Sequence, residues 1–207
     1  DKIIEIQPTG ANGANVVWEW RVWDHLIQNF DSLKPDYGMP SQHPELINLN
    51  FFTGSATSTD WQHCNSIDYD DSLDQIILSS HNFCEFWIID HSTTTQQAAS
   101  HTGGRYGKGG DLLYRWGNPQ TYGRGTAADK KLFGQHYPHR IKPGLKDAGA
   151  VLVFNNGAGR PGSSYSSVEL IALPMDPNGN FTQPATGTFQ PDSAYWKYTA
   201  PVPTDFF

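Results

Sequence analysis

The sequence predicts an all-β protein, specifically a β-propeller of four-stranded antiparallel blades, of which this chain covers about two blades and part of a third. Three observations lead to this prediction. Apolar residues recur with a period of two between turn signals, as half-buried strands require. Aromatic residues reach 13% and the chain carries 20 Gly and 14 Pro, a composition typical of turn-rich β structure. Four-strand groups also repeat along the chain, which is the sequence mark of a propeller.

The first strands are predicted as follows. The N-terminus is predicted to begin as a strand. Within residues 16–23, the alternation of a second strand places the side chains of Trp18, Trp20 and Val22 on one face. A connector rich in Pro, Asn, Ser and Gly covers residues 31–60. Strands are then predicted at residues 61–69, 75–80, 85–90 and 111–116, the first two joined by an acidic turn.

The same group then repeats, with strands predicted at residues 135–141, 150–155, 167–173 and 194–198. The outer strands share an aromatic-x-aromatic pattern that begins at Trp18, Tyr114 and Trp196, with spacings of 96 and 82 residues. These spacings exceed the usual 40–50 or so residues of a blade, so a β-sandwich is the alternative. The predicted blade pieces are residues 1–30, 60–119 and 133–200.

Two blades and a part of a third fall short of the four to eight blades that close a propeller. We therefore expect the chain to be a piece of a longer polypeptide. Residues 1–23 and 193–207 are expected to pack against further blades of the same polypeptide or against another copy of the chain, because open strand edges favour association.

Composition excludes several classes of protein. The formal net charge is −7, so a nucleic-acid partner is not expected. The longest apolar runs fall far below the roughly 20 residues of a membrane span. Cys64 and Cys84 are too few for a disulfide scaffold, and the predicted meander keeps them about 10 Å apart, so both should be free thiols. No zinc or EF-hand spacing is present, and neither a metal nor a cofactor is implied.

Two groups of polar residues are candidates for chemistry. Strand alternation places Trp61, His63 and Asn65 on one face, a pattern that fits either an anion site beside a flat ring or a buried polar network. His136 lies at the start of a later strand that also carries Arg140. A neutral imidazole can act as nucleophile or base while a guanidinium holds oxyanions.

Together these segments resemble the arylsulfotransferase (aryl-sulfate sulfotransferase) family over nearly all of residues 10–207. The segments that carry the resemblance are Trp18-Glu19-Trp20, Trp23-Asp24-His25-Leu26, residues 61–67, Leu113-Tyr114-Arg115-Trp116-Gly117-Asn118-Pro119, Gly134-Gln135-His136 and Phe154-Asn155-Asn156-Gly157. The resemblance implies a six-bladed propeller, secreted or periplasmic, that transfers sulfuryl groups between phenols through a sulfated histidine.

Carried over by motif, His63 and Asn65 match the family's His-x-Asn sulfate-binding pair, and His136 matches the histidine that becomes sulfated. His81 stands where the better-known members have an arginine. The leading hypothesis is therefore transfer from an aryl sulfate to a phenol, with His63, Asn65, His81 and Arg140 holding the substrate. The alternative is a catalytically inactive extracellular propeller that serves as a binding or structural module. A glycoside hydrolase would need a close carboxylate pair, which the candidate segments lack.

Overall fold

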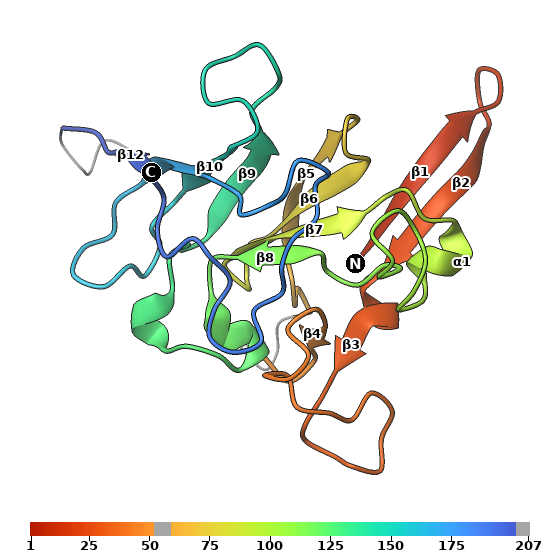
Figure 1. Ribbon diagram of the computed structural model, residues 1–207, viewed down its shortest axis with the longest axis horizontal. Coiled ribbons are helices and arrows are strands. Elements are labelled where there is room, and N and C mark those ends of the chain that lie inside the picture. Colours follow the sequence, from red (N-terminus) through yellow and green to blue (C-terminus); the bar gives the residue numbers. More distant parts are fainter. Residues whose placement is uncertain (52–58, 202–207) are drawn as a thin grey trace.

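The computed structural model describes residues 1–51 and 59–201, and the chain folds into mainly antiparallel β-sheets with almost no helix (Figure 1). Residues 52–58 of the predicted connector and residues 202–207 of the predicted terminal segment lie outside the described residues. Within residues 1–51 and 59–201, one α-helix occurs, α1 (Thr95–Ala98). The prediction of an all-β protein is confirmed. No helix in the described part of the chain has the length and apolar character needed to cross a membrane.

The first four-stranded sheet is an up-and-down meander in the order β5-β6-β7-β8. Its strands are β5 (Cys64–Asp70), β6 (Gln75–Ser80), β7 (Glu85–Asp90) and β8 (Tyr114–Trp116). Every residue of β6 and β7 is buried, which is why these two strands read as nearly continuous apolar runs and why their predicted bounds match the structure. The acidic turn after β5 is stabilised by the Asp70 carboxylate, which accepts hydrogen bonds from the backbone and the hydroxyl of Ser72.

The second four-stranded sheet repeats this order as β9-β10-β11-β12. Its strands are β9 (Gln135–Arg140), β10 (Val151–Asn155), β11 (Ser167–Ile171) and β12 (Trp196–Tyr198). Two hydrogen bonds join its first strand to β5: the Asn65 side-chain amide donates to the Gln135 carbonyl at 2.8 Å, and the Arg140 amide donates to the Asp68 carboxylate at 2.9 Å. The first strands of the two sheets therefore run beside each other.

An N-terminal hairpin precedes these sheets and forms the red arm of Figure 1. It consists of β1 (Lys2–Pro8) and β2 (Ala14–Arg21), and among the described residues β1 pairs with β2 alone. The strand predicted to reach residue 23 ends at Arg21, because a 3₁₀ turn, η1 (Val22–His25), follows and buries Val22 and His25. A short parallel pair, β3 (Leu26–Ile27) with β4 (Ile47–Asn48), comes next.

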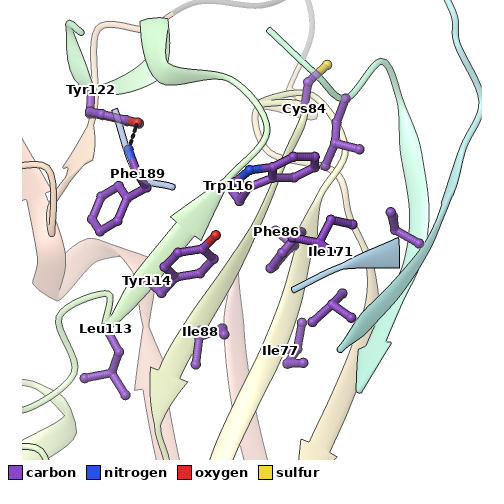
Figure 2. Close-up of a cluster of buried hydrophobic side chains, with 13 residues drawn as sticks. Ile77, Cys84, Phe86, Ile88, Leu113, Tyr114, Trp116, Tyr122, Ile171 and Phe189 are labelled. Atoms are coloured by element: carbon purple, nitrogen blue, oxygen red, sulfur yellow. Dashed lines mark hydrogen bonds between the residues drawn. The ribbon is translucent and has the colours of Figure 1, made fainter. Parts of the chain in front are cut away.

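One hydrophobic cluster fills the space between the two four-stranded sheets, and Figure 2 shows its side chains. Ile77, Phe86 and Ile88 of the first sheet meet Val153 and Ile171 of the second, all of them fully buried. Full burial of side chains of this size stabilises a fold by about 1.5–3 kcal/mol each relative to exposure. This packing holds β9 against the first sheet and so fixes where the ends of β5, β6 and β9 meet.

Candidate functional site

Three histidines that are far apart in the sequence lie together at one end of the adjoining sheets. His63 directly precedes β5, His81 directly follows β6, and His136 is the second residue of β9. The ring centroids of His63 and His81 are 4.9 Å apart, and those of His81 and His136 are 5.4 Å apart. The three proposed histidines thus form one continuous cluster with His81 in the middle.

The local backbone at His63 differs from the prediction. β5 begins at Cys64 rather than at residue 61, and His63 has a φ of 50°, in the left-handed region. The pairing of β5 with β6 is irregular between Cys64 and Ser66, so Asn65 occupies a bulge. Simple alternation of residues 61, 63 and 65 on one strand face is therefore wrong, because the three residues do not share one regular strand.

Asp60 completes this part of the site, and the sequence analysis missed it. Its carboxylate contacts Nδ1 of His63, and its backbone carbonyl accepts a hydrogen bond from the Asn82 side chain at 2.7 Å. Because a carboxylate accepts from Nδ1–H, it holds one tautomer and one ring orientation of the imidazole. Its position three residues before His63 was the only sequence signal.

His81 is held by its neighbour and by a glycine. The Nδ1 atom of His81 lies 3.0 Å from the side-chain oxygen of Asn82. Gly134 has a φ of 68°, and a Cβ at this position would lie 2.9 Å from Nε2 of His81. Only glycine therefore combines this backbone conformation with room for the imidazole.

Gln135 positions His136 from the buried side of β9. Its fully buried side-chain amide lies within hydrogen-bond distance of Ser79 Oγ, the Ser80 carbonyl and the Glu85 carbonyl, at 3.1, 3.1 and 2.7 Å. These contacts tie the start of β9 to the ends of β6 and β7. The placement of the His136 backbone is thus a consequence of sheet packing.

Several buried polar atoms at the site have no hydrogen-bond partner among the described residues, the side-chain oxygens of Gln135 and Asn118 among them. Two of them lie in or beside the histidine cluster: Nδ1 of His136 and the side-chain oxygen of Asn65. Buried polar atoms of folded proteins are nearly always paired, so such exceptions call for an explanation. A polar ligand that reaches into the histidine cluster would supply the missing partners.

A groove of about 340 Å³ opens beside His81. Its lining combines an aromatic ring, an imidazole, amides and an ammonium group; the residues are Phe51, His81, Asn82, Cys84, Asn118, Gln120, Lys130, Gly134 and Ala158. The Nζ atom of Lys130 also lies 4.8 Å from the ring centroid of Phe133. This lining suits an anion that carries an aromatic ring. Lys130 was missed because it lies in an irregular segment, where sequence periodicity says nothing about direction.

Arg140 is not brought to the histidines. It lies at the opposite end of β9 from His136, four residues or about 13 Å along the strand. Its Nε is 2.6 Å from the Asp70 carboxylate and its Nη2 is 3.1 Å from the Gln75 side chain. Burial lowers the pKa of Arg140, and Asp70 opposes that effect by favouring the charged form. The guanidinium therefore serves the pairing of the two sheets.

Cys64 follows His63 but is unsuited to react as a thiolate. Burial raises the pKa of its thiol from 9.0 to about 11, so the thiol stays protonated near neutral pH. Cys64 and Cys84 are both free, as predicted.

The model of the family described as Arylsulfotransferase (ASST) matches residues 1–172 of the 207-residue chain. No curated protein matches the sequence. The matched range includes the hairpin, the first sheet and the three strands β9, β10 and β11, and it contains every histidine of the cluster.

Proposed function

Because the chain belongs to the arylsulfotransferase family, we propose that it transfers a sulfuryl group from an aryl sulfate donor to a phenolic acceptor through a sulfohistidine on His136. The observation that carries this proposal is the contact of the His63, His81 and His136 rings beside a groove with an aromatic wall and an ammonium group. Sulfotransferase chemistry in general follows from the family; the histidine intermediate and the roles of single residues are our proposal.

The proposed reaction has two displacement steps at sulfur. In the first, a lone pair of the neutral His136 ring forms an N–S bond as the S–O bond to the aryl group breaks, and the leaving phenolate takes a proton from an acid. In the second, the oxygen of the acceptor phenol forms a new S–O bond as the N–S bond breaks. In this step the acceptor gives its proton to the group that served as the acid in the first step, so that group is restored and His136 returns to its neutral form.

The neighbouring groups have complementary roles. His63 is the acid: as an imidazolium it keeps Nδ1–H on the Asp60 carboxylate, gives the Nε2 proton to the departing aryl oxygen, and takes the acceptor's proton in the second step. Asn65, His81 and Lys130 stabilise negative charge on the nonbridging oxygens, because preorganised donors act most strongly where charge develops in the transition state. Lys130, rather than Arg140, supplies the cation that binds the sulfate oxygens, because Arg140 is paired with Asp70. No metal or cofactor is needed for these steps.

We further propose that the two four-stranded sheets are blades of a six-bladed propeller and that the protein works in the periplasm or outside the cell. Their up-and-down strand order and the contact of their first strands support the first part of this proposal.

The alternative function is a catalytically inactive extracellular propeller that serves as a binding or structural module. Exposed apolar residues on the hairpin, such as Ile4, Ile6 and Val16, favour it.

A chromogenic aryl sulfate separates the two functions. The full chain is expected to release the phenol in a burst and to carry one acid-labile sulfuryl group on the peptide that contains His136. His136→Ala should lower turnover by roughly a thousandfold or more, as removal of a covalent nucleophile does. His139→Ala is the matched control, since it removes another imidazole from the same strand, and its activity should be unchanged.

Two results would contradict the proposal. Undiminished turnover by a folded His136→Ala variant would exclude His136 as nucleophile. The absence of any phenol release by the native chain with several aryl sulfates would favour the binding module.

A further inference from the structure

A second cluster of metal-ligating side chains lies away from the three histidines. It consists of His25, at the end of η1, His101, in the loop after α1, and Asp111, shortly before β8. Nδ1 of His25 and Nδ1 of His101 each lie 2.8 Å from the same oxygen of Asp111. All three ligand atoms lie within 4.8 Å of one another, and no other group of this kind occurs in the part of the chain that the structure describes. The α1 and β3 labels of Figure 1 mark this side of the molecule.

The hydrogen bonds of His25 point to a cation at this place. Its Nε2 lies 2.8 Å from the carbonyl of Ala98, and a carbonyl only accepts, so Nε2 carries the proton. In a neutral ring, Nδ1 then has a lone pair that faces the Asp111 carboxylate, which is also an acceptor. A proton on one of the two groups, or a metal ion bound by both, must therefore account for this contact. Donation of the other ring N–H to a backbone carbonyl is what metal-bound histidines usually show.

The surroundings hold His25 in this orientation. Its ring is fully buried and stacks on Trp20, with centroids 5.5 Å apart and planes 7° from parallel. The Trp20 indole donates a hydrogen bond of 2.7 Å to the carbonyl of Gly110. A Cβ at Gly110 would lie 2.5 Å from Nε2 of His25, so only glycine leaves room for the bond to Ala98. A ligand fixed in this way loses little entropy when it binds an ion.

We propose that His25, His101 and Asp111 form a zinc site. Two imidazole nitrogens and one carboxylate oxygen are a donor set that suits Zn²⁺, whereas Ca²⁺ and Mg²⁺ prefer oxygen ligands throughout. In a tetrahedral zinc site the ligand atoms are about 3.3 Å apart, so each nitrogen would move away from the Asp111 oxygen by only a few tenths of an ångström. The His101 side chain is 61% exposed, which leaves one side open for a fourth ligand.

The ion would join three segments that are distant in the sequence. It would fasten the loop that carries His101 onto the end of the N-terminal hairpin and onto the entry to β8. No short motif contains these residues, which is why sequence spacing did not indicate a metal. The proposal is independent of sulfuryl transfer, since none of the three residues belongs to the His63, His81 and His136 cluster.

Zinc binding to the full chain tests the proposal. The chelator-treated protein is titrated with zinc chloride by calorimetry, with bound metal counted after dialysis, and one zinc per chain is expected. His101→Ala removes an exposed ligand and should lower zinc affinity by about 100-fold or more, since even changes outside the ligand shell cost 10–100-fold. Asp111→Asn should do the same. Cobalt(II) in place of zinc should give the visible absorption of a tetrahedral site.

Two control variants test whether zinc binding depends on these three residues and not on other histidines. His43→Ala removes another exposed histidine that is paired with a carboxylate, Glu45, and should leave zinc affinity unchanged. His81→Ala removes the centre of the histidine cluster and should also retain zinc. Failure of the native chain to bind zinc, or equal binding by His101→Ala, would overturn the proposal, as would loss of zinc in His81→Ala alone. A proton shared between His25 and Asp111 would then account for their contact.

Discussion

Replacement of Arg115 by methionine is expected to destabilise the fold severely. Arg115 and Glu85 are both fully buried, and Nη2 of Arg115 lies 2.6 Å from the Glu85 carboxylate. The guanidinium also donates to the carbonyls of Pro44 and Leu46, at 3.2 and 2.9 Å, and to Thr121 Oγ1 at 2.9 Å. One side chain thus neutralises a buried charge and ties β8 to two loops.

The magnitude follows from the groups left behind. Removal of one partner of a buried ion pair costs about 3–5 kcal/mol, because the other charge stays buried without compensation. Each buried carbonyl that loses its donor adds about 1–3 kcal/mol, less whatever relaxation recovers. We expect a total loss of about 4–6 kcal/mol for Arg115→Met, a large part of the 5–15 or so kcal/mol that stabilises a typical domain.

Urea denaturation of a double-mutant cycle measures this effect. Arg115→Met combined with Glu85→Leu removes both charges, so the double variant should be more stable than Arg115→Met alone. Arg115→Lys keeps the charge but loses the planar fork, and its smaller loss, about 2 kcal/mol, remains measurable if Arg115→Met does not fold. A loss below about 1 kcal/mol in Arg115→Met, or additive effects in the cycle, would refute the reasoning.

Three further predictions concern single sites. Gly134→Ala should lower sulfuryl transfer tenfold or more because its Cβ would displace His81; Gly159→Ala has a similar φ, 74°, but no neighbour within 4 Å, so it should lose stability and keep activity. Burial raises the pKa of Cys64 from 9.0 to about 11, so its contribution to stability is complete below pH 9 and up to about 3 kcal/mol of it is lost between pH 9 and 11. In urea titrations across this range, Cys64→Ala should therefore lose less stability with rising pH than the native chain does, by about that amount. The exposed hairpin should promote self-association, which Ile6→Lys should weaken in sedimentation; a monomeric native chain would contradict this.

The strands were predictable because their signals are local. Residues 75–80 and 85–90 carry short apolar runs between turn signals, as is typical of buried central strands, and the structure has β6 and β7 at those bounds. The family was predictable for a related reason, since its motifs are short and contiguous, and the family model covers residues 1–172. Free cysteines followed from strand order alone.

The site depended on contacts that no local pattern encodes. His81 meets His136 because the hydrophobic cluster between the sheets holds β9 against the first sheet. Lys130 reaches the groove from an irregular segment, and Arg140 turns to Asp70 because the far end of β9 faces the acidic end of β5. The side chain of His63 does not follow the alternation of a strand, because the backbone at His63 has a left-handed conformation.

Sequence by itself therefore determined the all-β class, the central strands and the family, since each depends on residues that are neighbours along the chain. Only the tertiary structure decided which polar side chains share a site. It separated Arg140 from the histidines and joined His25 to His101 and Asp111. The physical reason is that packing between sheets and loops sets distances between residues dozens of positions apart, and a period of two or a short motif carries no information about those distances.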